Sequence, residues 1–167
     1  MVEIAHSCIN ALKNKARLLT ASADVTPMLP GESVDLVVTS PPFLDVVDYA
    51  GDNWLRGWFC GIAINEVPIA IHKKVEDWQR FMTGVFCELK RVLKPGGWIA
   101  FEVGEVKGGK LLLEDAVVPA AHAAGLLPVA VMINAQSFTK TANCWGVGNN
   151  AKGTNTNRIV LLRKIPV

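Results

Sequence analysis

Runs of apolar residues separated by polar turns predict a series of short strands along the chain. The clearest run covers residues 33–39 and is almost continuously apolar, which is typical of a strand buried on both faces of a parallel sheet. Residues 98–103 follow a Pro-Gly-Gly turn and predict a second strand. Two further strands are predicted at 129–135 and 158–163, and a short one at 17–21.

Between these runs, apolar residues recur at spacings of three and four, which predicts helices. The longest such segment covers residues 75–93 and ends at a Pro-Gly-Gly sequence that stops a helix. Shorter segments predict helices at 4–12, 54–62 and 113–124. Trp54 and Trp58 form an apolar stripe on the second of these, and we expect that stripe to belong to the core.

The order of these elements predicts an α/β fold with a mostly parallel sheet and an antiparallel strand at its end. The sequence has no evident internal repeat or linker, so one domain is expected over residues 1–167, with a long loop at 139–157. Ligands of such sheets bind beyond the carboxyl ends of the strands. The segment Thr39-Ser40-Pro41-Pro42-Phe43 stands at such an end.

Composition excludes several classes of protein. Half of the 167 residues are hydrophobic and 19% are charged, unlike a disordered chain, and the net charge of +2 is unlike a basic nucleic-acid coat. Apolar runs stay too short for a membrane span, and no signal peptide is evident. The four cysteines form no CxxC pair, so we expect no metal site and reduced, mostly core thiols in a cytoplasmic protein.

The turn after residues 33–39 has a specific chemical capacity. Two consecutive prolines fix two φ angles and remove two N–H donors, so the turn is stiff and presents carbonyl acceptors. The Ser40 hydroxyl adds an acceptor, and Phe43 offers a flat apolar face. These groups suit a planar ring with an exocyclic amino group. The alternative is an ordinary Pro-Pro turn that ends a strand beside a core phenylalanine.

Two motifs resemble those of known enzymes. Residues 32–43 resemble the motif of amino-group DNA methyltransferases in which an apolar strand is followed by Ser/Asp/Asn-Pro-Pro-Tyr/Phe. Residues 89–97, Leu-Lys-Arg-Val-Leu-Lys-Pro-Gly-Gly, are similar to a helix-to-strand junction of many S-adenosylmethionine-dependent methyltransferases. The resemblance covers residues 16–165 and implies a Rossmann-like class I methyltransferase sheet. It also implies S-adenosylmethionine as cofactor and DNA as partner, as in restriction-modification enzymes.

The resemblance implies that the target base is flipped into the site and methylated on its amino nitrogen. Ser40 and the Pro41 carbonyl would accept hydrogen bonds from that amino group, Pro42 would stiffen the turn, and Phe43 would stack on the base. The serine form of the motif favours N4-cytosine over N6-adenine. An RNA amino-methyltransferase, or a non-catalytic nucleic-acid-binding or assembly module of the same fold, remains the alternative.

Further residues are weaker candidates for the site. Possible cofactor-binding residues are Ser22, Asp24, Thr39 and Glu102. Possible substrate-binding residues are Asp45, Tyr49 and Asn53, which follow the motif, and Lys140, Trp145 and Asn149 in the long loop. Helix caps, surface positions, a solvated strand end and a hairpin connection are the alternative interpretations of these residues.

One expected element is missing from the resemblance. The family carries a glycine-rich turn of the Asp-x-Phe-x-Gly-x-Gly type, which holds the methionine part of the cofactor. No such element stands before residue 16 or after 165, and the glycine-containing segment 101–109 is a poor substitute. The sheet is therefore expected to be incomplete. The chain would be a fragment, a half that needs a partner chain or self-association, or an inactive homologue.

Overall fold

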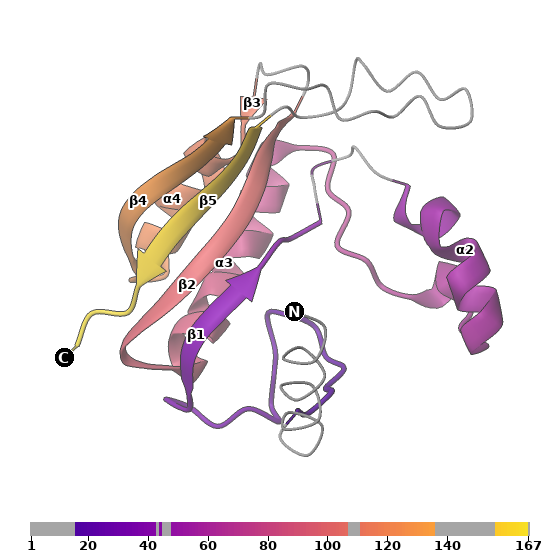
Figure 1. The fold of residues 1–167 in the computed structure, drawn as a ribbon, viewed down its shortest axis with the longest axis horizontal. Helices are drawn as coiled ribbons and strands as arrows, with labels where there is room; N and C mark the ends of the chain where they lie inside the picture. Colours follow the sequence, from indigo (N-terminus) through magenta and orange to yellow (C-terminus); the bar gives the residue numbers. More distant parts are fainter. Residues whose placement is uncertain (1–15, 43, 45–47, 107–110, 136–155, 167) are drawn as a thin grey trace, which may run out of the picture.

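The computed structural model describes residues 16–42, 44, 48–106, 111–135 and 156–166 (Figure 1). The helix expected at 4–12 and almost all of the loop expected at 139–157 lie outside these residues. Of the described helices, none is long and apolar enough to cross a membrane.

A mixed sheet forms the centre of the fold, in the strand order β1-β2-β5-β4. Its strands are β1 (Val34–Thr39), β2 (Leu93–Val106), β4 (Leu127–Ala135) and β5 (Thr156–Arg163), and the two-residue β3 (Leu111–Leu112) pairs with the end of β2. β1 pairs with β2 in parallel, and β5 is antiparallel to both β2 and β4. β1, β2 and β4 thus share one direction, which confirms the predicted sheet with its terminal antiparallel strand.

The close approach of β1 and β2 depends on Gly97, which lies near the start of β2. A Cβ atom on this residue would lie 3.0 Å from the Lys94 carbonyl oxygen and 3.2 Å from that of Asp35. Both neighbours are backbone atoms that cannot move aside easily. The Pro-Gly-Gly sequence therefore does more than end the preceding helix: it lets the second strand begin directly beside the first.

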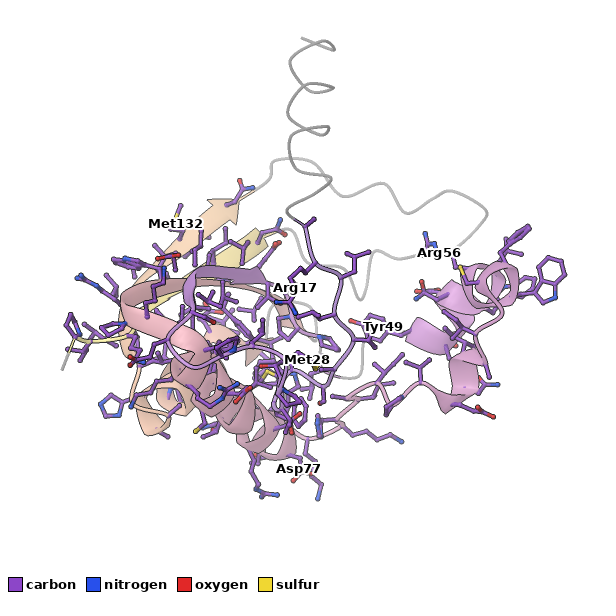
Figure 2. The ribbon with its side chains drawn as sticks, turned by 90° about the horizontal axis from the view of Figure 1, so that it is seen from below. Arg17, Met28, Tyr49, Arg56, Asp77 and Met132 are labelled. Atoms are coloured by element: carbon purple, nitrogen blue, oxygen red, sulfur yellow. The ribbon has the colours of Figure 1, made fainter. Side chains whose placement is uncertain are left out.

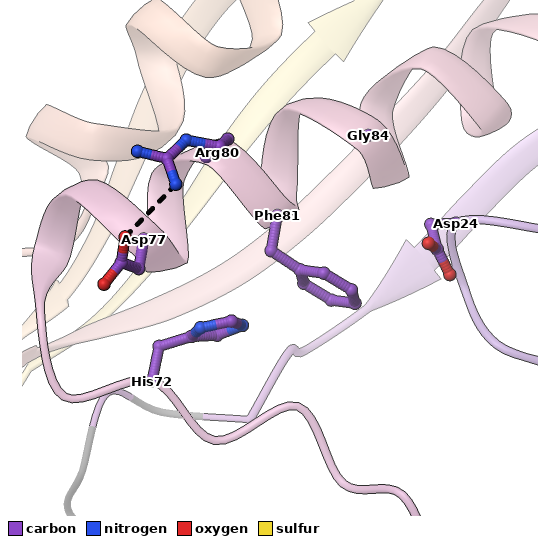
Figure 3. Close-up of a pocket in the computed structure, with 6 residues that line it drawn as sticks. All are labelled: Asp24, His72, Asp77, Arg80, Phe81 and Gly84. Carbon is purple, nitrogen blue, oxygen red and sulfur yellow. Dashed lines mark hydrogen bonds and ion pairs between the residues drawn. The ribbon is translucent and has the colours of Figure 1, made fainter.

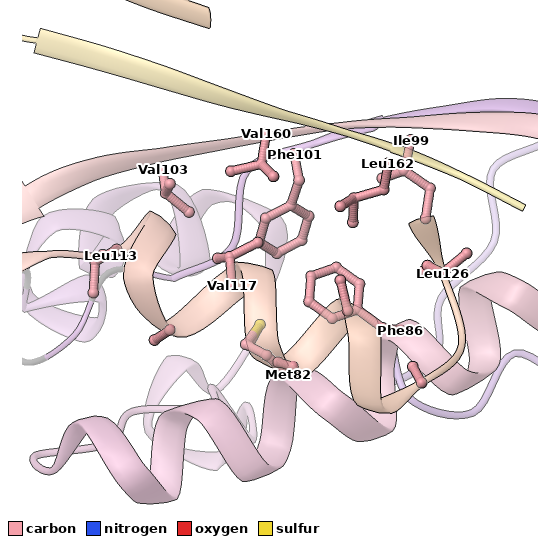
Figure 4. Close-up of a cluster of buried hydrophobic side chains, with 14 of the residues drawn as sticks. Met82, Phe86, Ile99, Phe101, Val103, Leu113, Val117, Leu126, Val160 and Leu162 are labelled. Carbon is pink, nitrogen blue, oxygen red and sulfur yellow. The ribbon is translucent and has the colours of Figure 1, made fainter. Parts of the chain in front are cut away.

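Two helices, α3 (Val75–Val92) and α4 (Glu114–Ala123), cover one face of the sheet (Figures 1 and 4). Their apolar faces pack against inward-facing strand residues, and Phe86 of α3 contacts Phe101 of β2 edge to face at 4.9 Å between ring centroids. α4 continues through Pro119 and ends before Gly125, whose φ of 76° needs a glycine. The structure thus confirms both helices that the spacing of apolar residues predicts.

The opposite face of the sheet is bare among the described residues. Leu36 and Val38 of β1 are 57% and 73% exposed, and they share this face with Trp98 and Ala100 of β2. Met132 of β4 also lies on this face and is 54% exposed. The prediction that residues 33–39 are buried on both faces is therefore wrong. β1 stands at the edge of the described sheet, and no described element covers its outer face.

The chain between β1 and α3 projects away from the sheet and contains α2 (Tyr49–Cys60) and the short 3-10 helix η1 (Ile64–Glu66) (Figure 1). The helix was predicted, but its core role is wrong, because Trp54 and Trp58 are 60% and 69% exposed. Gly57 is the only buried residue of α2. Helical spacing identified the helix without revealing that no described layer packs on its apolar stripe.

Two smaller expectations are also wrong. Residues 17–21 form no strand: Leu18 is almost fully exposed, and the segment has no neighbouring strand to pair with among the described residues. Cys60 and Cys87 are exposed free thiols, not core residues, because each lies on a face of its helix that nothing described covers. Cys8 and Cys144 lie outside the described residues.

Candidate functional site

The Ser40-Pro41-Pro42 turn follows β1 directly and is anchored by α3. The indole Nε1 of Trp78 donates a hydrogen bond to the carbonyl oxygen of Pro42 at 3.2 Å. Trp78 is fully buried, and so, nearly, is Leu44, which follows the turn. A buried indole N–H needs an acceptor, so packing α3 against the sheet also fixes the position of the turn.

Two acceptors of the turn stay available for a ligand. Ser40 is exposed, and in the described part of the chain neither its hydroxyl nor the carbonyl oxygen of Pro41 takes part in a hydrogen bond. Pro41 and Pro42 are only partly exposed, and neither has an N–H donor that would compete for these acceptors. Phe43, the expected stacking residue, lies outside the described residues.

Behind the turn lies an apolar pocket of about 230 Å³. The Ser40-Pro41-Pro42 turn and Thr39 form one wall of this pocket. α3 contributes the opposite wall, and Ala23 from the segment before β1 closes one side. Phe81 of α3 and Phe101 of β2 are the aromatic residues of the lining. The pocket therefore combines a few acceptors at one end with an apolar interior, the usual composition of a small-molecule site.

A second, more open cavity of about 490 Å³ adjoins this pocket, since Phe81 lines both (Figure 3). Asp24 stands on one side and the ring of His72 on the other, with its centroid 5.4 Å from that of Phe81. The rim carries the exposed ion pair between Asp77 and Arg80 at 3.3 Å. We call this space the outer cavity. Its aromatic wall and the Asp24 carboxylate, which unlike Asp77 is not paired with Arg80, suit a flat ring that donates a hydrogen bond.

A polar cluster on α3 holds the segment that carries Asp24. Glu88 accepts hydrogen bonds from the backbone N–H and the hydroxyl of Thr26, and Arg91 pairs with Glu88 at 2.7 Å. Hydrogen bonds from Arg91 and then from Thr26 lower the pKa of Glu88 from 4.5 to about 2. Glu88 is therefore ionised throughout the physiological pH range and binds this segment as a carboxylate.

The structure brings three of the four predicted cofactor residues to one region. The Ser22 hydroxyl donates a hydrogen bond to Asp24, which lines the outer cavity, and Thr39 lines the adjoining pocket. Glu102 is separated from them, since it pairs with Ile159 on the bare face, whereas its neighbour Phe101 faces the pocket.

The predicted substrate residues are not brought to these cavities. Asn53 makes local contacts on α2, donating to the Tyr49 carbonyl at 2.9 Å and accepting from Arg56 at 2.8 Å. Neither Tyr49 nor Asn53 lines the pocket or the outer cavity. Predicted residues outside the described part of the chain are Asp45, Lys140, Trp145 and Asn149.

The glycine-containing segment 101–109 does not provide the missing turn in its described part. Residues 101–106 continue β2, and Gly104 pairs with Asn157 of β5. In the part of the chain that the structure describes, no three His, Cys, Asp or Glu side chains are grouped so as to hold a metal ion.

Several residues of the site were not identified from the sequence. Trp78 and Phe81 were identified only as members of a helix face, Arg91 only as part of the motif at 89–97 and a possible phosphate contact, and His72 and Glu88 not as site residues at all. A signal was present for some of them: Phe81, Gly84, Glu88 and Arg91 recur at helical spacing and so share one side of α3. Nothing in the sequence indicated that residues 22–29 pack on that side.

Comparison with known proteins gives a family and a fold. The sequence pattern of the family N6_N4_Mtase, described as DNA methylase, matches residues 34–159. A solved structure named as a candidate DNA modification methylase of Thermus thermophilus superposes with a TM-score of 0.52 at 21% identity, over 90% of this chain and 54% of that one. No curated protein sequence matches.

A second similar structure limits what the fold alone implies. The [4+2]-cyclase SpnF superposes with a TM-score of 0.52 at 13% identity, over 98% of this chain and 62% of that one. A cyclase and a methylase thus share this fold, so activity has to be argued from the site. The chain spans only about half to two thirds of the length of these two structures.

Proposed function

Because the chain belongs to the DNA methylase family whose pattern spans residues 34–159, we propose that it forms the target-base side of a methyltransferase. The substrate would be a base flipped out of DNA, and the acceptor atom its exocyclic amino nitrogen. N4 of cytosine is favoured over N6 of adenine because the motif begins with Ser40.

The observation that carries this proposal is the pair of unused acceptors at the carboxyl end of β1. Ser40 Oγ and the Pro41 carbonyl oxygen accept hydrogen bonds from the two amino hydrogens, which turns the nitrogen lone pair out of conjugation with the ring. Bound S-adenosylmethionine would supply the methyl group to this nitrogen with loss of the carbon–sulfur bond, and the amino proton would pass to solvent. The residues supply orientation and electrostatics, not a covalent nucleophile.

The residues of the outer cavity fit the adenosine end of S-adenosylmethionine. When bound, S-adenosylmethionine supplies an electrophilic sulfonium methyl group. Phe81 offers an aromatic face for the adenine ring, and the Asp24 carboxylate accepts a hydrogen bond from its amino group. Thr39 lines the adjoining pocket together with Ser40, and we propose that it contacts the part of the cofactor nearest the target base.

The methionine end of the cofactor needs residues that the described chain does not offer. We propose that a further polypeptide segment or partner chain adds its strand along the free edge of β1 and carries the glycine-rich turn. The described sheet supports this proposal because β1 pairs only with β2, so its other edge is free, and a helix following the added strand would cover the exposed Leu36 and Val38.

A second candidate function is favoured by the missing turn itself. Without glycine-rich residues to hold the cofactor, the chain would act as a nucleic-acid-binding or assembly module that keeps the fold. An RNA substrate would be methylated by the same chemistry as DNA, since Ser40 and Pro41 would bind an amino group of the base and not the sugar.

Calorimetry with S-adenosylmethionine, followed by transfer of a labelled methyl group to DNA and RNA oligonucleotides, tests the proposal. Binding in the micromolar to millimolar range with transfer that is lost in Ser40→Ala supports the methyltransferase. Ser33→Ala is the matched control, because its hydroxyl bonds to the Pro30 carbonyl away from the site. Nucleic-acid binding without any cofactor binding would instead favour the binding module.

A further inference from the structure

Glu88 and Arg91 connect α3 to the segment that borders the outer cavity. We propose that these two residues position Asp24 and thereby make the outer cavity selective for a ring that carries an amino group. This inference rests on the proposed function for the identity of the ligand. The positioning itself rests on hydrogen bonds within the chain.

The connection begins with two hydrogen bonds that Glu88 accepts from Thr26. One carboxylate oxygen, Oε1, accepts from both the backbone N–H of Thr26, at 2.8 Å, and its hydroxyl. Glu88 and Thr26 lie 62 positions apart in the sequence, so this contact is purely tertiary. The Glu88 side chain is 11% exposed, which limits competition from water. Two donors on one carboxylate oxygen fix both the position and the direction of the chain at Thr26.

Arg91 completes the connection from the next turn of α3. Its Nε and one terminal nitrogen, Nη2, donate to the two carboxylate oxygens of Glu88, each at 2.7 Å. The same Nη2 donates to the carbonyl oxygens of Thr26, at 3.2 Å, and Leu29, at 3.0 Å. Arg91 thus orients Glu88 and binds both ends of the turn from Thr26 to Leu29, so the pair acts as one unit, which we call the Glu88–Arg91 clamp.

The clamp fixes the position of Asp24 because only one residue, Val25, separates Asp24 from Thr26. The backbone N–H of Val25 donates to the Ser22 carbonyl at 3.1 Å, so Asp24 lies in a turn that ends one residue before Thr26. Asp24 also passes close to α3 at Gly84, where an added Cβ would lie 3.9 Å from the Asp24 Cβ. A shift of Thr26 would therefore move the Asp24 carboxylate along the wall of the outer cavity.

The carboxylate at this place discriminates between rings by their hydrogen-bonding groups. An ionised carboxylate only accepts hydrogen bonds, so it favours an amino group and disfavours a keto oxygen at the same ring position. Adenosine and inosine share their ribose and ring shape and differ at C6, an amino group in adenosine and a keto oxygen in inosine, and at the adjacent N1, which carries a hydrogen only in inosine. Stacking on Phe81 contributes equally to both nucleosides. The ratio of their affinities therefore measures how well Asp24 is placed, separately from how well the cavity is formed.

A double-mutant cycle in the full chain tests the proposal, with adenosine and inosine as probes. We expect Asp24→Asn and Glu88→Gln each to weaken adenosine binding about tenfold and inosine binding less than twofold. We also expect the double variant to lose no more than Asp24→Asn alone, because Glu88 acts through Asp24. Glu76→Gln, the same change at an exposed position of α3, is the control and should alter neither affinity.

Equal losses for both nucleosides in Glu88→Gln, or additive losses in the double variant, would overturn the positioning role. Amide hydrogen exchange at Val25 and Leu29 gives a readout that needs no ligand, and Glu88→Gln should accelerate it while Glu76→Gln should not. If the wild-type chain binds neither nucleoside, the cofactor part of the proposed function and the selectivity proposed here both fail. Unchanged exchange in Glu88→Gln would refute the clamp itself.

Discussion

The buried indole of Trp78 donates its N–H to the carbonyl oxygen of Pro42, across 36 positions of sequence and between α3 and the turn after β1. The two prolines make the turn stiff, and this bond sets where the stiff turn points. Because the Pro42 carbonyl oxygen is already bonded to Trp78, the acceptors that remain for a ligand are those of Ser40 and Pro41. The core and the site are therefore joined through one hydrogen bond.

Trp78→Phe should destabilise the chain and disturb the turn. It keeps most of the aromatic packing but removes the donor and leaves the Pro42 carbonyl unpaired, so we expect a loss of about 1–3 kcal/mol in the free energy of unfolding. Urea unfolding measures this loss. Trp98→Phe is the matched control, since Trp98 lies on the bare face and is 36% exposed. Equal effects of the two substitutions would contradict the anchoring role of Trp78.

The buried pair of Glu114 and Arg158 should be a second site of high sensitivity. Glu114 begins α4, Arg158 lies on β5, and their side chains are 9% and 14% exposed. Glu114→Ala leaves the Arg158 charge without this partner, and we expect a loss of about 3 kcal/mol. Asp115→Ala, one residue later on the exposed side of α4, should cost less than about 0.5 kcal/mol. Thermal unfolding of both variants would detect a failure of this contrast.

Much of the fold was predictable because its signals are local. The apolar run of β1, the helical spacing of α3 and the glycine that ends α4 each identify an element from its own residues. The same signals cannot report what lies outside an element. Val38 and Val37 are both valines in one strand, yet only Val37 packs against the core, because a sheet needs neighbours on both faces to bury both. Trp54 and Trp58 were misassigned to the core for the same reason.

The candidate site was predictable only where a motif is contiguous. Ser40 and Pro41 were identified because they belong to a motif of consecutive residues. Asp24 was identified through a resemblance, and its neighbours at the outer cavity, His72 and Phe81, come from distant segments. Glu88 and Arg91 resemble an ordinary surface pair at a spacing of three on a helix. Their contacts with Thr26 exist only in the folded chain, so no pattern in the sequence could specify them.

The stability contributed by Glu88 should depend on pH in acid. Its pKa is about 2 in the folded chain and 4.5 in a free carboxyl group, so the unfolded chain binds the proton more readily. The contribution is complete above about pH 4.5 and is lost as the pH falls toward 2. Glu88→Gln should therefore be less stable than wild type at pH 6, and the difference should shrink steadily below pH 4.5. Urea unfolding at pH 6, 4 and 3 measures it, and a constant difference would disprove the assignment.

Two neighbouring valines of β1 offer a direct test of the bare face. Val37 points toward the core formed with α3, whereas Val38 is 73% exposed on the opposite face. In this chain Val38→Lys should change the free energy of unfolding by less than about 0.5 kcal/mol, because a lysine there stays in water. Val37→Lys should cost several-fold more, since its ammonium group would displace apolar contacts. If Val38→Lys instead costs as much as Val37→Lys, then something covers that face in solution, which would contradict the bare face of β1. On this same face, Met132 of β4 is also exposed (Figure 2).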